Sequence, residues 1–226
     1  MAKTYTMAID GPAGAGKSTM AKRLAKELGY YYVDTGAIYR TVAYFLDLLG
    51  ISPKDVDGVE RYLDELTVDI EYDEEGRQHM FMNGMDVTDD IRTQDISQKA
   101  SLVSAHAIVR DVLLDMQRDV AKKHNVIMDG RDIGTVVLPK ATVKIFLTAS
   151  AEVRAQRRTQ ELLEKGQKVT YEQVLKDIKQ RDHQDTTRLV APLKQAKDAV
   201  LLDTSALDID GVIDAMKAII GQKIPL

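Results

Sequence analysis

The sequence predicts an α/β fold, a doubly wound parallel sheet with helices on both faces, and three observations carry this prediction. Short runs of apolar and β-branched residues, at 5–9, 30–34, 125–129, 143–148 and 199–203, alternate with segments of helical periodicity. These runs are nearly all apolar rather than alternating, which is typical of parallel strands covered on both faces. A glycine-containing turn follows the first run and leads directly into a helical segment. Strands that alternate with helices favour a doubly wound core.

The expected helices follow the strands along the chain. The first, "STMAKRLAKELG", ends at Gly29 as its C-cap. Further helical patterns lie at 38–49, 106–123, 151–165, 171–188 and 208–221. We find no internal repeat and no low-complexity segment.

One segment, 67–87, breaks the alternation of strand and helix. It contains the period-two run "VDIEY", the turn "EEGR" and the dipeptide Asn83-Gly84 between two short strands. Asn-Gly flanked by alternating residues is the strongest short hairpin signal. We therefore expect a small antiparallel insert, which is either a peripheral excursion or a flap over a bound substrate.

Composition and charge narrow the class of protein. A chain of 226 residues fits one domain, or one core with a small insert. The net charge of -4 argues against a broad nucleic-acid-binding surface. The absence of cysteine excludes a disulfide framework and a thiolate metal site. No apolar run approaches the ~20 residues of a membrane span, and "MAKTYTMAID" leaves no room for a cleavable signal peptide, so we expect a cytoplasmic enzyme.

The segment "GPAGAGKS", Gly11 to Ser18, fits the phosphate-binding pattern G-x-x-x-x-G-K-[ST] at every fixed position. Its glycines allow the backbone N–H groups to turn inward around phosphate oxygens, and the following helix points its positive end at the same place. Lys17 supplies a mobile cation, and the Ser18 hydroxyl sits where Mg²⁺ is usually held. With a strand before it and a helix after it, this loop predicts a P-loop NTPase-type nucleotide site.

Asp129 ends the apolar run "NVIMD". From this position a carboxylate of a P-loop protein often approaches Mg²⁺, directly or through water. A strand-end aspartate that caps the next turn explains the residue equally well, and the sequence leaves both explanations open.

Three groups of charged residues follow separate elements that the α/β order brings to one edge of the sheet. They are Asp34, Thr35 and Arg40 in "DTGAIYR", Arg131 and Asp132 in "DGRDIGT", and Arg181, Asp185 and Arg188 in "QRDHQDTTR". The last group has an alternative interpretation as a solvated helix face with a weak Arg181–Asp185 surface pair. Arginine is suited to holding phosphate in a bidentate fork, so convergence of Arg40, Arg131 and Arg188 favours a phosphate site.

A further helix carries Arg154, Arg157 and Arg158 at helical spacing. This is more positive charge than one nucleotide requires, so we infer two phosphorylated ligands and transfer between phosphates. A phosphate monoester has its second pKa near ~6 and needs little activation as an acceptor. The four histidines (79, 106, 124 and 183) are scattered and are interpreted as structural or surface residues.

Taken together, these motifs resemble the bacterial cytidylate kinases, the (d)CMP kinases among the P-loop nucleoside monophosphate kinases. The resemblance spans essentially the whole chain. Its motifs are "IDGPAGAGKST", "VDTGAIYR", "DDIRTQDIS", "MDGRDIGTVVLP", "KIFLTAS", "RAQRR", "IKQRD" and "VAPL", all in the order of the family. The pair "DTGAIYR" and "DGRDIGT" is far more specific than the phosphate loop alone.

The resemblance implies a core at 1–36, 105–153 and 169–226, a monophosphate-binding part with the β insert at 37–104, and a short lid at 154–168. It implies catalytic roles for Lys17, Arg131 and Arg188, and Mg²⁺ held at Ser18 and Asp129. The implied ATP site consists of Gly11, Pro12, Ala13, Gly14, Ala15, Gly16, Lys17, Ser18 and Thr19, with Arg154 and Arg158. The implied CMP site consists of Thr35, Arg40, Ser101, Arg110, Arg131, Asp132, Arg181, Asp185 and Arg188.

Within the implied CMP site, Arg40, Arg131 and Arg188 would hold the phosphate, and Arg181 with Asp185 would hold the sugar. Ser101, Arg110 and Asp132 would read the cytosine edge. Thr35 stands where the family commonly has serine, and the added methyl group could alter the preference between acceptor bases.

The resemblance implies ATP-dependent phosphorylation of CMP and dCMP, with ATP and CMP or dCMP as the ligands. From charge and hydropathy we expect no nucleic-acid or membrane partner, and because nothing in the sequence demands assembly we expect a monomer. A P-loop kinase for another acceptor, such as UMP or AMP, is the nearest alternative. A nucleotide-dependent switch is a further alternative, but the stretch "FLTAS" lacks the guanine-recognition motif that a switch predicts.

Overall fold

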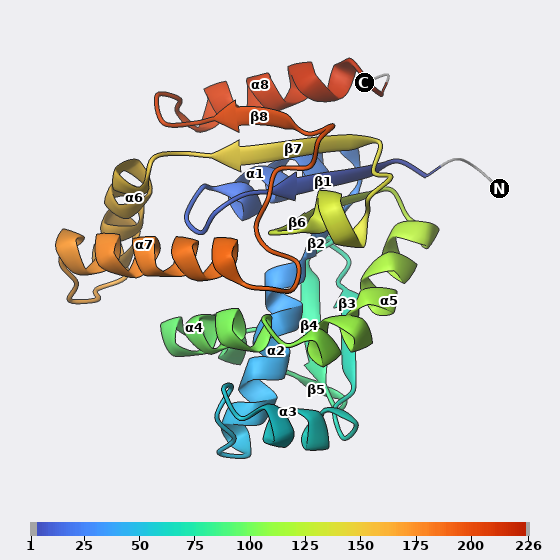
Figure 1. Ribbon diagram of the computed structural model, residues 1–226. Coiled ribbons are helices and arrows are strands. Elements are labelled where there is room, and N and C mark those ends of the chain that lie inside the picture. Colours follow the sequence, from blue (N-terminus) through green and yellow to red (C-terminus); the bar gives the residue numbers. More distant parts are fainter. Residues whose placement is uncertain (1–3, 225–226) are drawn as a thin grey trace.

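The computed structural model describes residues 4–224 and is built around a five-stranded parallel sheet with the strand order β2-β6-β1-β7-β8 (Figure 1). The strands are β1 (Thr6–Asp10), β2 (Tyr31–Asp34), β6 (Val126–Gly130), β7 (Val143–Thr148) and β8 (Val200–Asp203). All their pairings are parallel. The doubly wound parallel sheet that the sequence predicts is confirmed.

Alternate residues of the strands contribute side chains to two apolar layers, one on each face of the sheet. Met7 and Ile9 of β1 pack with α1 (Lys17–Leu28) and α8 (Ile209–Gly221). Ala8, which lies between them, packs on the opposite face with Ala121 of α5 (Ala107–Lys123). Side chains of successive strand residues point to opposite faces, so a strand that is apolar throughout is buried on both sides.

A second apolar cluster holds the part of the chain between β2 and β6, which lies below the sheet in Figure 1. It joins α2 (Thr35–Leu48), α3 (Val56–Leu63), α4 (Gln94–Val103) and the small antiparallel sheet β3-β4-β5. The strands of this sheet are β3 (Val68–Tyr72), β4 (Gln78–Met82) and β5 (Met85–Asp86). The predicted antiparallel insert is confirmed.

The turn between β4 and β5 has the predicted chemistry. Asn83 and Gly84 have φ values of 50° and 79°, the left-handed conformations that a tight hairpin requires. Two elements of this part, α3 and α4, were not expected from the sequence, and neither was the 3₁₀ turn η1 (Asp90–Arg92).

The helices α6 (Ala151–Glu164) and α7 (Tyr171–Thr187) pack against each other through a small apolar cluster of their own. They lie beside the carboxyl end of the core sheet, at the left in Figure 1. A π-helical turn, η2 (Ile133–Val137), follows β6. Among residues 4–224, no helix is both long and apolar enough to cross a membrane.

Two glycines fix the ends of the loop and helix that follow β1. Gly11 has a φ of 152°, and a Cβ atom there would lie 1.9 Å from the carbonyl oxygen of Leu147 on β7. The glycine therefore allows the loop to leave the sheet at this point. Gly29 caps α1 with a φ of 66°, as predicted.

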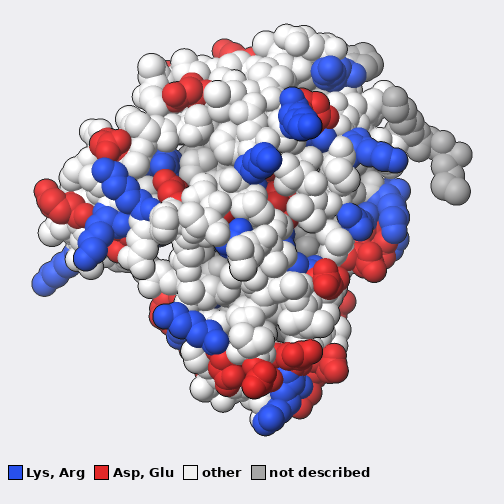
Figure 2. Space-filling view, viewed as in Figure 1, with Lys and Arg blue, Asp and Glu red and all other residues white. Residues whose placement is uncertain are grey.

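Charged side chains of both signs are spread over the face that Figure 2 shows, and no large basic field is visible there. Acidic side chains gather at the lower end, where Figure 1 places α3.

Candidate active site

A cavity of about 720 Å³ lies at the carboxyl end of the core strands. Its walls come from the loop after β1, the junction of β2 and α2, the ends of α4 and β6, the helices α6 and α7, and the segment 204–209. Because the carboxyl ends of parallel strands meet at one edge, this is where α/β folds place their ligand sites.

The loop Ala13–Ser18 forms one wall of the cavity. Gly16 is the N-cap of α1 and makes no side-chain cap, so the first N–H groups of the helix stay open toward the loop. The Nζ atom of Lys17 donates to the carbonyl oxygen of Pro12 at 2.8 Å. Burial, together with the nearby charge of Arg131, lowers the pKa of Lys17 well below its usual value. A bound phosphate would reverse this effect, because it would favour the charged amine.

Ser18 and Asp129 form a pair at the start of α1. The Ser18 hydroxyl donates to Asp129 Oδ2, and the Tyr32 hydroxyl donates to Asp129 Oδ1, both at 2.8 Å. Burial, with the charge of Asp34, raises the pKa of Asp129. A divalent cation would reverse this shift by compensating the buried charge.

The donor set at this point fits Mg²⁺. Residues 4–224 contain no group of three or more histidine, aspartate or glutamate side chains that could hold a metal by themselves. Mg²⁺ is usually bound through one or two protein oxygens together with water and substrate phosphates. A carboxylate and a hydroxyl beside a phosphate-binding loop match that requirement.

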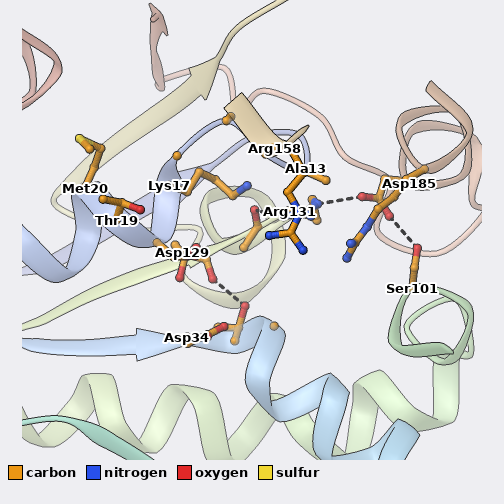
Figure 3. Close-up of a pocket in the computed structure, with 18 of the residues that line it drawn as sticks. Ala13, Lys17, Thr19, Met20, Asp34, Ser101, Asp129, Arg131, Arg158 and Asp185 are labelled. Atoms are coloured by element: carbon orange, nitrogen blue, oxygen red, sulfur yellow. Dashed lines mark hydrogen bonds and ion pairs between the residues drawn. The ribbon is translucent and has the colours of Figure 1, made fainter. Parts of the chain in front are cut away.

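The three arginines expected to converge, Arg40, Arg131 and Arg188, all line the cavity. Figure 3 shows Arg131 between Lys17 and Asp185. The Arg131 Nε atom donates to Asp185 Oδ2 at 2.8 Å. Arg188 is the C-cap of α7, one residue past its end, and its guanidinium donates to the carbonyl oxygen of Ala191 at 2.8 and 2.5 Å.

Two guanidinium groups that line the cavity are left with an open donor. The Nε atoms of Arg40 and Arg181 are buried and have no hydrogen-bond partner among the described residues. Burial, with the neighbouring charge of Arg131, lowers the pKa of Arg181 from its usual value to about 10. Leaving a buried donor unpaired costs about 1–3 kcal/mol, so the hydrogen bonding of both guanidinium groups is incomplete within the protein.

Asp185 is buried, and its partners differ from the surface pair considered above. It accepts from Arg131 and, at 3.2 Å, from the hydroxyl of Ser101 on α4 (Figure 3). Although burial opposes ionisation, Arg131 and Arg181 hold the pKa of Asp185 below its usual range. The interpretation of Arg181 and Asp185 as a solvated surface pair is therefore wrong.

Arg110 and Asp132 form a buried ion pair in the cavity wall. Arg188 approaches the other carboxylate oxygen of Asp132 at 3.4 Å. Ser104 links the same groups, because its carbonyl oxygen accepts from Arg110 at 3.2 Å and its hydroxyl accepts from Arg188 at 3.0 Å. The cavity therefore has a charged, hydrogen-bonded corner far along the chain from the phosphate loop.

Arg154 does not line the cavity. Its guanidinium donates to the carbonyl oxygen of Ala13 at 2.9 Å and forms two contacts, at 3.1 and 2.5 Å, with Asp182 of α7. It therefore supports the loop from behind. Arg157 and Arg158 of the same helix do line the cavity, and Arg157 donates to the carbonyl oxygen of Thr204 at 2.8 Å.

The remaining expected residues have the following positions. Thr35 lines the cavity and donates its hydroxyl to the carbonyl oxygen of Asp129 at 2.7 Å. Thr19 lines the cavity, whereas Gly11 and Pro12 lie at the base of the loop outside its lining. None of the four histidines, all within the described residues, lines the cavity.

The sequence reasoning missed several residues of the cavity wall. Tyr39 lies under the guanidinium of Arg110, 5.4 Å from ring centroid to Cζ, and Ser104 joins Arg110 to Arg188. Tyr39 directly precedes Arg40 in "DTGAIYR", so the motif contained a signal for it. Ser104 had no such signal, because the helix it caps was not expected.

The chain matches the model of the family "Cytidylate kinase" over residues 7–222. A cytidylate kinase from an Exiguobacterium species is 49% identical over 222 residues, which cover 98% of this chain and 99% of the relative. The cytidylate kinase of Carboxydothermus hydrogenoformans is 50% identical over 217 residues, covering 96% and 97%. A solved structure of an uncharacterized protein from Eubacterium ventriosum superposes with a TM-score of 0.50 at 14% identity, covering 95% of this chain and 97% of that one, which is a likeness of fold alone.

Proposed function

The chain belongs to the cytidylate kinase family, and from this premise we propose that it transfers the terminal phosphate of ATP to CMP and dCMP, giving CDP or dCDP and ADP. One observation carries the proposal beyond the family. The cavity is lined by a phosphate-binding loop and, from other elements, by Arg40 and Arg181, whose buried Nε atoms have no hydrogen-bond partner among the described residues. A site for one nucleotide alone would leave these donors unused.

The acceptor phosphate would lie between the loop and the arginines. Arg40, Arg131 and Arg188 line this region from three separate elements, and a phosphate offers each of them the acceptor oxygens that guanidinium groups bind best. The guanidinium of Arg40, which among the described residues donates only to Asp34 through one Nη atom and leaves its Nε atom unpaired, would gain acceptors in this arrangement. Arg131 would exchange part of its contact with Asp185 for the phosphate.

The reaction needs alignment and charge neutralisation rather than a general base. An oxygen of the acceptor phosphate, already a dianion at neutral pH, forms a bond to the γ-phosphorus of ATP. The bond from that phosphorus to the β–γ bridging oxygen breaks, and its electron pair stays on ADP. Lys17, Arg131 and Arg188 would oppose the negative charge on the transferred group. Ser18 and Asp129 would hold Mg²⁺, which when bound would offset part of the negative charge of the ATP phosphates.

The buried ion-paired corner would read the base. Cytosine offers an amino donor beside two acceptors. Asp132 would accept from the amino group, while Arg110 and Ser101 would donate to the acceptors. Asp185 contacts Arg131 of the proposed phosphate site and Ser101 of the proposed base site, and Arg181 lines the same cavity, so we assign both residues to the sugar.

On the donor side, residues Ala13–Thr19 would hold the phosphates of ATP, and Arg158 would approach them from the proposed lid, 154–168. We replace Arg154 with Arg157 as the second lid arginine, because Arg157 faces the cavity and Arg154 does not. A cytoplasmic location and a monomeric state remain predictions from the sequence.

The test is an ADP-release assay with ATP and Mg²⁺ against CMP, dCMP, UMP and AMP. We expect turnover with CMP and dCMP and little with UMP or AMP. Arg40→Gln should weaken the binding of CMP, seen as a higher KM for CMP, and leave the KM for ATP near that of the wild type. Arg77→Gln, on the exposed hairpin, is the matched control and should change neither KM. Turnover with UMP or AMP in place of CMP would overturn the choice of acceptor. Hydrolysis of ATP that no acceptor accelerates would overturn the proposal as a whole.

A further inference from the structure

The antiparallel insert makes no contribution to the cavity lining. None of residues 67–87 faces the cavity, which does not support the idea of a flap over the substrate. The insert instead lies against β2, at the edge of the core sheet, and packs Met80 and Met82 against α2. Its relation to the site must therefore run through those elements.

β2 is an edge strand, so half of its backbone groups lack a partner strand. The N–H group of Tyr31 bonds to Asn125 on the β6 side, so the groups of Tyr32 and Asp34 point to the open edge. The insert supplies partners for both. The hydroxyl of Tyr72 donates to the carbonyl oxygen of Tyr32 at 3.1 Å.

Gln78, the first residue of β4, binds both the N–H group and the carbonyl oxygen of Asp34. Its Oε1 atom accepts from the N–H group of Asp34 at 2.7 Å, and its Nε2 atom donates to the carbonyl oxygen of the same residue at 3.4 Å. The side-chain amide thus takes the place of a neighbouring strand. Gln78 is 9% exposed, so a displaced amide would lose these bonds without water to replace them.

Asp34 in turn holds the guanidinium groups beside the proposed phosphate site. Its Oδ1 atom caps α2 by accepting from the N–H group of Ala37 at 2.9 Å. Its Oδ2 atom accepts from Arg40 at 2.9 Å and from Arg92 of η1 at 3.1 Å. Although burial opposes ionisation, these two arginines hold the pKa of Asp34 below its usual range. The position of the Asp34 backbone therefore sets the position of Arg40.

We propose that the insert orients Arg40 for the acceptor phosphate, with Gln78 as a positioning residue that acts through Asp34. This inference rests on the proposed function, because it needs a phosphate at Arg40. Arg92 contributes to the same positioning of Arg40, since both arginines donate to Asp34 Oδ2. Without Arg92 the carboxylate would pair with Arg40 alone and hold it back from the phosphate.

The first test compares two variants of the insert. Gln78→Met keeps the length of the side chain and removes its bonds to Asp34. Loss of one or two hydrogen bonds in the arrangement should raise the KM for CMP by about two- to tenfold and leave the KM for ATP unchanged. Tyr72→Phe is the matched control, because it removes the insert's bond to Tyr32 and leaves Asp34 untouched. Equal effects of the two variants on the KM for CMP would overturn the proposal.

A second pair of variants covers the case in which Gln78→Met does not fold. The side chain of Arg92 is 41% exposed, so its replacement leaves the core intact. Arg92→Met should raise the KM for CMP, and Arg92→Lys should restore part of the loss by returning the charge. A KM for CMP that neither variant changes would also contradict the proposal.

A readout without catalysis separates this proposal from the proposed function. The Nε–H signal of Arg40 in a nitrogen-15 NMR spectrum, assigned with Arg40→Lys, reports the orientation of the guanidinium directly. It should shift in Gln78→Met and stay in place in Tyr72→Phe, whatever reaction the protein catalyses. If the signal shifts in Gln78→Met but the protein does not phosphorylate CMP, the positioning role stands and the proposed function is wrong. If the protein phosphorylates CMP but the signal does not shift, the proposed function stands and the positioning role is wrong.

Discussion

Asp132→Asn tests how the cavity distinguishes cytosine from uracil. Asp132 is 4% exposed and accepts from Arg110 through Oδ2 and from Arg188 through Oδ1 at 3.4 Å. An asparagine retains one acceptor oxygen, which Arg110, the closer guanidinium, should take. The amide nitrogen then replaces Oδ1 and offers donors where the wild type offers an acceptor. The amino group of cytosine would meet a donor, and the carbonyl group of uracil would find a partner.

The magnitude follows from the bond that is lost. A hydrogen bond to a charged group contributes about 1.5–3 kcal/mol, which corresponds to a fall of about 10- to 150-fold in kcat/KM for CMP. UMP should lose nothing from the same change, so the ratio of CMP to UMP activity should fall by at least about tenfold. The assay is ADP release at saturating ATP with each acceptor in turn.

Asp182→Asn is the matched control for this experiment. Asp182 is also paired with a buried arginine, Arg154, but does not line the cavity. It should therefore leave the ratio of CMP to UMP activity unchanged. If folded Asp132→Asn keeps the preference of the wild type, the assignment of Asp132 to the base is wrong.

Three further predictions concern transfer, folding and pH. Arg188→Ala should lower kcat with CMP by about 10²–10³-fold with little change in the KM for ATP, and unchanged turnover would remove Arg188 from the phosphate site. Gly11→Ala should destabilise the fold by about 2 kcal/mol or more in urea unfolding, because its Cβ atom would lie 1.9 Å from the Leu147 carbonyl oxygen, whereas Gly76→Ala, with open space around it, should cost about 1 kcal/mol or less. Burial raises the pKa of Asp10 from 3.8 to about 6, so its contribution to stability is complete below the lower value and is lost as pH rises through the higher one. Relative to Asp10→Asn, the wild type should lose about 2 kcal/mol of unfolding free energy between pH 4 and pH 7, and unfolding free energies that change with pH in the same way in both proteins would refute this.

Much of the arrangement follows from the sequence because topology decides it. In a parallel sheet the carboxyl ends of the strands share one edge, so residues that follow β1, β2 and β6 must lie close together. Lys17, Thr35, Asp129 and Arg131 do so. The order of strands and helices is thus enough to predict which chain segments form the cavity.

The pairing of side chains could not be predicted in the same way. Spacing along α7 suggests a contact between Arg181 and Asp185, but Asp185 instead binds Arg131, which directly follows β6. Spacing along α6 does not distinguish Arg154, which supports the loop, from Arg157, which faces the cavity. These outcomes depend on the distance between packed elements, and periodicity within one helix contains no information about it.

The observed ion pairs explain how the protein can hold several partly buried arginines close together in the absence of a bound nucleotide. Arg40, Arg131 and Arg188 each have a carboxylate within ion-pair distance, at Asp34, Asp185 and Asp132. A buried charge without such a partner would be strongly destabilising. A phosphate can displace a carboxylate from a guanidinium at modest net cost, because both offer the same bidentate geometry. Binding is then an exchange of partners, and release of the product restores the internal pairs, so a dense cationic site can turn over without holding its anions too tightly.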